Sequence, residues 1–143
     1  MPIAGVPRHE EIRVGQITTA GGCDKYLCVG PGTNQQQTVK SGANERILGV
    51  TIEDVSTVNR WQQYCCDGVV AVIAGAAINR LTDGFNTQLV TTTLGRVIAL
   101  SDQAGTYWVV GEMDNSSAAA AAAGDIVHML LYEEAEAVTV AGS

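Results

Sequence analysis

The stretch GDIVHMLLY, residues 124–132, decides the fold class. Successive side chains of a β-strand point to opposite faces, and here both sets of alternate residues are largely apolar. A strand that is apolar on both faces is typical of the interior of a sheet that is covered on both sides. We therefore predict a central, buried strand in which Val127 and Leu131 are core residues, so that a polar replacement of either one unfolds the domain.

On both sides of this stretch, the chain contains short runs rich in β-branched and aromatic residues, bounded by Gly, Asn, Asp and Pro. Asp-Gly and Gly-Gly pairs at the boundaries supply residues that tolerate positive φ in tight turns. About ten strands at short intervals predict a mainly β fold, arranged as a small barrel or sandwich. The predicted strands cover residues 11–19, 26–30, 37–40, 47–52, 60–66, 68–73, 86–93, 96–101, 106–113 and 125–132.

Six consecutive alanines, residues 118–123, stand just before the central strand. Alanine is the strongest helix former, but an isolated helix shorter than about 12 residues is marginal in water. With Asp114 or Ser116 as the N-cap and Gly124 at the end, we predict a short Ala-rich helix that packs on the end of the sheet. A flexible low-complexity linker is the alternative interpretation.

The composition limits the classes of partner. The 143 residues suit one domain, and the 16% of charged residues is below the average of about 25%. Residues 1–80 contain seven acids and seven bases, whereas residues 81–143 contain eight acids and Arg96. An acidic surface repels phosphate, which argues against nucleic acid. No membrane span or secretory signal is recognisable, so we expect a soluble protein made in a cytoplasm, with no membrane partner.

The sequence offers few residues for catalysis or metal binding. The histidines are His9, in a Pro-containing segment, and His128, which we interpret as a core or interface residue of the apolar strand. Adjacent carboxylates face opposite sides of a strand and do not converge on a substrate. The four cysteines do not have zinc-site spacing, and we expect reduced structural thiols. We predict no catalytic residue, no cofactor and no metal, and hence a protein that is not an enzyme.

Four aromatic residues are candidates for ligand contact: Trp61, Tyr64, Tyr107 and Trp108. Aromatic rings can stack on the apolar faces of sugars, so these residues could line a carbohydrate-binding surface. Packing in a core or in a protein interface is the other interpretation.

A set of segments in a particular order carries a resemblance to a known family. ILGVTIEDV (47–55) is followed by DGVVAVIAGAAINRLTDGF (67–85), LGRVIAL (94–100) and VVGEMDNSSAAAAAAGDIVHMLLYEE (109–134). From about residue 12 to 134, this order resembles the small capsid decoration, or cement, proteins of tailed bacteriophages. The alanine run corresponds to the short Ala-rich helix of that family.

The chain departs from the family pattern at two places. Glu112 and Met113 stand where a small residue is usual, and residues 56–66, STVNRWQQYCC, are bulkier and more polar than the turn and strand commonly found there. We interpret both differences as specific to one capsid lattice.

The resemblance implies a β-barrel or β-tulip-like domain that forms a homotrimer on the outer face of the mature capsid. There it would bridge major capsid protein subunits and stabilise the shell mechanically, since many modest contacts act together. The protein would then be a structural component of the virion. The alternative is a tail or head-fibre β module that binds host-surface glycans.

We divide the chain into an extended N-terminal arm (1–11), a single β domain (12–134) and a C-terminal tail (135–143). The arm contains two prolines and a glycine, so it cannot be helical throughout, and it suits a segment that becomes ordered by adding a strand to a partner. A frayed terminus is the alternative. The candidate capsid-interface residues are Pro2, Ile3, Val6, Pro7, Arg8, His9, Ile12, Trp61 and Tyr64.

Overall fold

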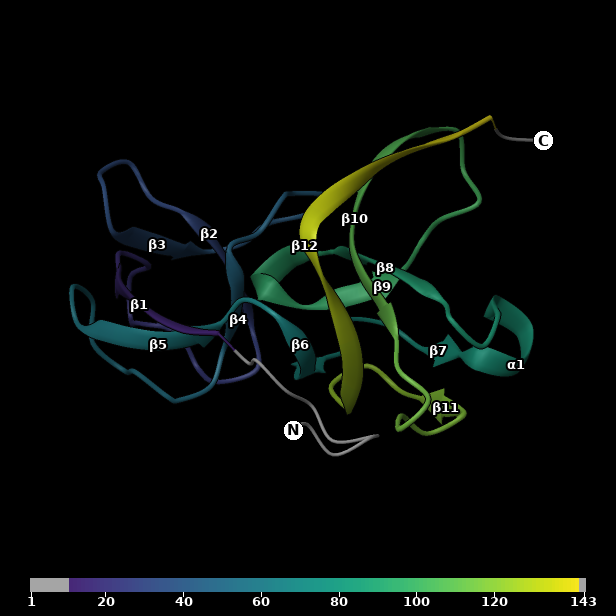
Figure 1. Ribbon diagram of the computed structural model, residues 1–143, viewed down its shortest axis with the longest axis horizontal. Helices are drawn as coiled ribbons and strands as arrows, with labels where there is room; N and C mark the ends of the chain where they lie inside the picture. The colour runs from purple at the N-terminus through teal and green to yellow at the C-terminus, as the bar shows by residue number, and fades with distance from the viewer. Residues whose placement is uncertain (1–10, 142–143) are drawn as a thin grey trace, which may run out of the picture.

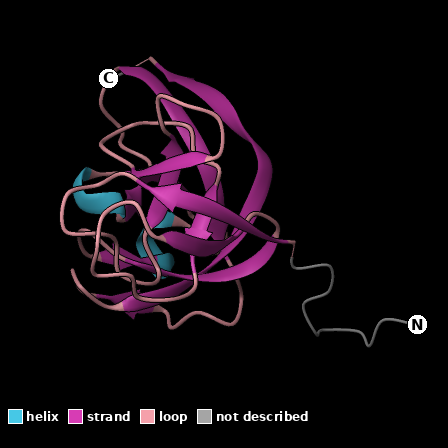
Figure 2. Cartoon of the chain, turned by 90° about the vertical axis from the view of Figure 1, so that its left-hand side faces the viewer, coloured by secondary structure: helices cyan, strands magenta, loops and turns pink. Residues whose placement is uncertain are grey.

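The computed structural model describes residues 11–141 and is mainly β (Figures 1 and 2). All ten predicted strands are present, which confirms the predicted fold class. The strands are β1 (Ile12–Ile17), β2 (Cys28–Pro31), β3 (Gln37–Lys40), β4 (Gly49–Thr51), β5 (Trp61–Cys65), β6 (Gly68–Ile73), β7 (Ile78–Asn79), β8 (Gln88–Thr91), β9 (Val97–Ala99), β10 (Gly105–Met113), β11 (Ala120–Ala121) and β12 (Ile126–Val140). The helices are α1 (Arg80–Asp83) and the 3-10 helix η1 (Thr93–Gly95).

The first five strands form a closed barrel in the order β1-β3-β2-β4-β5. It closes because β1 pairs with β5 on one side and with β3, in parallel, on the other. The barrel interior is filled by Ile17, Leu27, Val29 and Tyr64, which are buried together. This barrel occupies the left half of Figure 1.

The second half of the molecule is a five-stranded sheet in the order β6-β12-β10-β8-β9. An isolated parallel bridge between Ala74 and Val97 connects the end of β6 with β9, so the sheet curls back toward itself. Strand β12 lies between β6 and β10, as its apolar sequence predicted.

Only one face of β12 is buried, which corrects the expectation that both faces are covered. Val127, Met129 and Leu131 lie in the core, while Ile126 and Leu130 are exposed. Apolar alternation was therefore not sufficient evidence of burial on both sides.

The barrel and the sheet share one hydrophobic core. Cys28, Val50 and Cys65 point outward from the barrel and pack with Val72 and Met129 of the sheet. Within the barrel, the close approach of β4 to β5 depends on Gly49, because a Cβ atom there would lie 2.3 Å from the Cys65 carbonyl oxygen and 2.7 Å from Tyr64 Cδ2. This shared cluster, which is separate from the one inside the barrel, holds the two sheets together.

The predicted Ala-rich helix is wrong. Of the alanine run, Ala120 and Ala121 form the short strand β11, which pairs with β7, and the rest is turn and loop. The surrounding backbone takes up the hydrogen bonds that a helix would need: the Ala119 carbonyl accepts from Arg80 N–H, and the Ala122 N–H donates to Asp125 Oδ2. These tertiary bonds replace a helix that is too short to be stable on its own.

The C-terminal boundary also differs from the prediction. Strand β12 continues to Val140, so residues 135–140 belong to the sheet instead of a separate tail. Residues 1–10 of the predicted arm lie outside the described residues. Within residues 11–141, no helix is long and apolar enough to cross a membrane.

Candidate interaction surface

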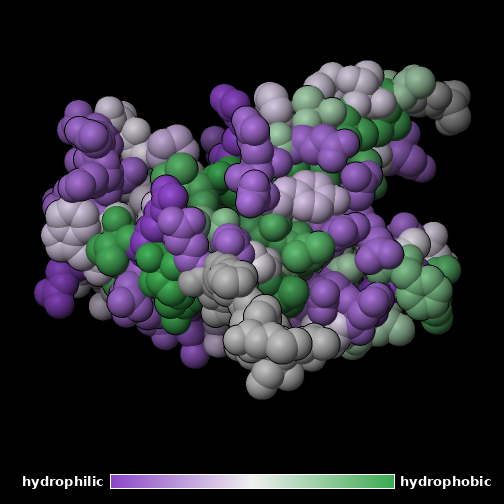
Figure 3. Space-filling view, viewed as in Figure 1, coloured by the Kyte–Doolittle hydropathy of each residue, from purple (hydrophilic) through white to green (hydrophobic). Residues whose placement is uncertain are grey.

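Four apolar side chains are exposed on the outer face of the barrel. Val14 of β1 pairs with Gln63 of β5, and the Ile52 N–H donates to the Gln63 carbonyl oxygen from the other side, so these three residues form one row across the strands. Ile12 and Trp61 flank the row. We call Ile12, Val14, Ile52 and Trp61 the barrel patch; their exposed fractions range from 38% to 53%. Figure 3 shows apolar side chains gathered over β1 and β5.

The barrel patch includes two of the predicted interface residues, Ile12 and Trp61. Tyr64 lies instead in the barrel interior, because it is one residue out of phase with Trp61 and Gln63 on β5. Its side chain is therefore not available as a surface contact. The remaining candidates, Pro2, Ile3, Val6, Pro7, Arg8 and His9, lie outside the described residues.

Sequence reasoning missed Val14 and Ile52 as surface residues. Ile12 and Val14 are two positions apart on a strand and must share a face. The prediction that Ile12 lies in an interface therefore implies that Val14 is exposed on the same face. Ile52 carried no such signal, because its position beside Gln63 depends on which strands pair.

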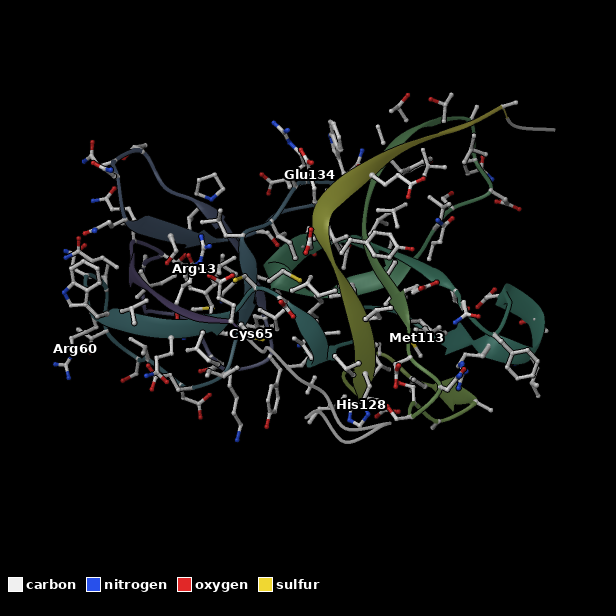
Figure 4. The ribbon with its side chains drawn as sticks, viewed as in Figure 1. Arg13, Arg60, Cys65, Met113, His128 and Glu134 are labelled. Atoms are coloured by element: carbon white, nitrogen blue, oxygen red, sulfur yellow. The ribbon has the colours of Figure 1, made fainter. Side chains whose placement is uncertain are left out.

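A polar hollow of about 320 Å³ adjoins Trp61 at the far end of the barrel. Its carboxylates are fixed by backbone amides: Glu53 Oε1 accepts from Gln63 N–H at 2.9 Å, and Asp54 Oδ1 accepts from Lys25 N–H at 2.8 Å. Arg60 also lines the hollow (Figure 4). The hollow can form hydrogen bonds to hydroxyl groups beside an exposed aromatic ring.

Trp108 is less available than Trp61. The Arg46 guanidinium lies 4.9 Å from the centre of its ring, and its backbone N–H donates to Asn44 Oδ1 at 2.8 Å. Tyr107 is also occupied, since its hydroxyl donates to the Gln103 carbonyl oxygen. Of the four aromatic candidates, Trp61 presents the most open ring.

His128 is exposed on the outer face of β12, which contradicts a place in the core and leaves the interface interpretation a prediction (Figure 4). Its Nδ1 lies 2.9 Å from Ser116 Oγ, and Ser116 Oγ donates to Asp114 Oδ2 at 2.5 Å. In a nucleophilic triad the base accepts the serine proton and the carboxylate orients the base. Here the carboxylate contacts the serine, and the arrangement ties the alanine-run loop to β12.

The thiols are not poised for chemistry. Burial raises the pKa of Cys28 to about 12 and that of Cys23 to about 11. Burial also raises the pKa of Cys66 to about 11, and a hydrogen bond with Glu11 adds to the shift. Nucleophilic cysteines need a lowered pKa. Within residues 11–141, no cluster of three or more His, Cys, Asp or Glu side chains is placed to hold a metal ion.

These thiols predict a loss of stability at alkaline pH. In the unfolded chain they ionise near pH 9, whereas in the fold they stay protonated to about pH 11 or 12. Their contribution is therefore complete below about pH 9 and is lost as the pH rises toward 12. Tyr64 and Tyr132, whose pKa values are also raised mainly by burial, add to this loss. Urea unfolding across this range should show a falling free energy of unfolding, and Cys28→Ala should flatten the decline. A level profile in the wild type would contradict the prediction.

Comparison with known proteins identifies a shared fold. No protein-family model matches the chain, and no curated protein matches it by sequence. Among solved structures, it is similar to the head fiber gp8.5 N base of bacteriophage phi29, with a TM-score of 0.61 and 15% identity. The alignment covers 88% of this chain and 98% of that chain. At this level of identity, the likeness establishes the architecture that the two chains share.

Proposed function

We propose that this chain is a structural protein of a bacteriophage virion that binds the outer face of the mature capsid and bridges major capsid protein subunits. In this proposal it acts as a homotrimer, has no catalytic role and is assembled onto the particle after synthesis in the host cytoplasm. The likeness to a phage head-fiber base supports a phage structural protein, and the sequence resemblance to capsid decoration proteins supports the capsid as its binding site.

The fold likeness supports the coarser part of the proposal, a phage structural protein, because it extends over 88% of this chain and 98% of that chain. It concerns a component of a phage head, and it is independent of the motif order that suggested decoration proteins. The barrel patch adds a physical basis for binding. Exposed apolar side chains that lie together on a rigid sheet contribute binding energy when a partner covers them.

The barrel patch and residues 1–10 are the capsid contacts in this proposal. The described chain begins at Glu11, whose carbonyl oxygen accepts from Cys66 N–H beside β5. Glu11 therefore lies at one end of the patch, beside Ile12. An arm that leaves from this position can extend the contact made by the patch.

Capsid binding tests the proposal directly. We expect the protein to saturate mature, expanded capsids and not compact procapsids. Val14→Asp should weaken binding about tenfold or more, because it places a charge in the apolar contact. Leu94→Asp is the matched control, since Leu94 is also exposed and apolar but lies on η1, away from the patch. Occupancy is measured by quantitative gel analysis of sedimented capsids.

Two outcomes would count against this assignment. Equal occupancy for Val14→Asp and Leu94→Asp would remove the patch from the interface, and absence of wild-type binding would refute capsid decoration. Deletion of residues 2–10 keeps the Glu11 contact, so unchanged occupancy of this variant would exclude a role for the arm.

A second candidate function is glycan binding by a head- or tail-fibre module. The observation that favours it is the exposed Trp61 ring beside the polar hollow with Glu53 and Asp54. Saturable binding of oligosaccharides by the isolated protein, lost in Trp61→Ala, would favour this candidate.

A further inference from the structure

The last part of the β10–β12 hairpin extends beyond the rest of its sheet. Residues 105–109 pair with residues 136–140, whereas β6 pairs with β12 only from Ile126 to Leu131 and β8 pairs with β10 only from Val109 onward. Figure 1 shows this two-stranded ribbon leaving the body of the molecule at the upper right. Both of its edges therefore lie beyond the neighbouring strands.

One edge of the ribbon is closed by a side chain. Asn44 Oδ1 accepts from the Trp108 backbone N–H at 2.8 Å, and Asn44 Nδ2 donates to the Thr106 carbonyl oxygen at 3.1 Å. The amide thus satisfies the β10 edge in the way that a neighbouring strand would. Arg46, stacked on Trp108, covers the same side.

The opposite edge is open, and the register shows which groups it offers. Because the Trp108 N–H and Thr106 C=O point toward Asn44, the pairs Trp108–Ala137 and Thr106–Thr139 are the non-hydrogen-bonded pairs of the ladder. The N–H and C=O groups of Ala137 and Thr139 consequently point away from β10. No other part of residues 11–141 hydrogen-bonds to these groups. Such an edge is a template for another strand.

The surroundings of this edge are acidic. Glu133 and Glu134 lie in the bulge where β12 bends, and Glu136 begins the edge (Figure 4). Among the described residues the ion pair is Arg13–Glu11, so these glutamates have no basic partner at ion-pair distance. A hollow of about 310 Å³ lies where β6 begins, before the edge, and Asp67 and Glu133 line it together with Glu11 and Arg13.

We propose that the β12 edge, residues 136–140, binds an extended segment of a partner protein that contains lysine or arginine. The segment adds a strand beyond Gly68, where β6 begins, with backbone hydrogen bonds to Ala137 and Thr139, and its cations neutralise the glutamates. A second copy of this chain is a poorer occupant, because its own β12 edge carries the same glutamates. If the proposed function holds, the segment belongs to the major capsid protein, but the edge chemistry does not depend on that function.

Amide hydrogen exchange on the full chain tests the proposal, with a short synthetic peptide of alternating lysine and valine as the probe. Saturating peptide should slow exchange at Ala137 about tenfold or more. A peptide of alternating glutamate and valine should give no protection. Thr139→Pro should abolish the protection, because proline has no N–H to donate.

Thr106→Pro is the matched control. It loses the same 3.3 Å contact between the Thr106 and Thr139 hydroxyls, but it removes an N–H from the edge that faces Asn44. Protection at Ala137 should therefore survive. The proposal would be overturned if the two peptides gave equal protection or if neither gave any. It would also be overturned if the protein without peptide formed an oligomer that Thr139→Pro dissociates.

Capsid binding distinguishes this proposal from the proposed function. Thr139→Pro should bind mature capsids about tenfold more weakly than Thr106→Pro. Equal binding by the two variants would exclude the capsid protein as the source of the segment. Absence of wild-type binding would refute the proposed function alone, since the peptide assay reports on the edge directly.

Discussion

A Val127→Asp variant is expected to be unfolded without denaturant. Val127 is 3% exposed, pairs with Val72 and lies in the core shared by the barrel and the sheet. The substitution loses about 1.5–3 kcal/mol of apolar burial and places a carboxylate in the core at a cost of several kcal/mol more. The sum approaches the total stability of about 5–15 kcal/mol that a domain of this kind has.

Ile126→Asp is the matched control for this experiment. Ile126 is the preceding residue of the same strand, pairs with Ile73 and is 55% exposed. Its replacement should change the free energy of unfolding by about 1 kcal/mol or less. Circular dichroism and urea titration measure both variants. A cooperative transition of wild-type midpoint for Val127→Asp would show that the core is not where the structure places it.

An Arg80→Met variant should be destabilised by about 3–5 kcal/mol, because three acceptors lose a charged donor. Arg80 is buried, and its guanidinium donates to the carbonyl oxygens of Phe85 and Ser117, at 2.9 and 2.8 Å, and to Asn115 Oδ1 at 3.1 Å. It thereby joins the α1 segment to the loop that contains the alanine run. Methionine keeps the length of the side chain and supplies none of these hydrogen bonds.

Differential scanning calorimetry should show a midpoint lowered by about 10 °C or more for Arg80→Met. Arg80→Lys should recover only part of the loss, since an ammonium group does not reproduce the planar fork of donors. Leu81→Ala, at an exposed neighbouring position, is the control and should leave the midpoint nearly unchanged. A small effect of Arg80→Met would indicate that the loop does not depend on this arginine.

Val127→Asp and Arg80→Met should affect different properties of the protein. Val127 supports the core on which both sheets pack, so its replacement should abolish every binding activity. Arg80 holds a loop at the far side of the sheet from the barrel patch. We therefore expect Arg80→Met to lower thermal stability while the folded protein keeps the barrel patch and the β12 edge.

The candidate surfaces were only partly accessible from the sequence. The sequence predicts Ile12 and Trp61 as interface residues, and both are exposed. It also predicts Tyr64, which is buried, because one residue along a strand reverses the direction of the side chain. The open β12 edge could not be predicted, since it depends on where the pairing of β12 with β6 stops, at Gly68, and on the side chain of Asn44.

Local sequence determined the strands, the turns between them and the central place of β12, because alternation, β-branched residues and Asp-Gly turns act over a few residues. Only the tertiary structure decided the closure of the barrel, the exposed outer face of β12 and the loss of the predicted alanine helix. The Arg80 and Asp125 hydrogen bonds to the alanine run come from residues that are distant in sequence or lie beyond its end. A segment this short is not stable as a helix on its own, so the hydrogen-bond partners around it determine its conformation. Its own sequence does not specify which residues become those partners.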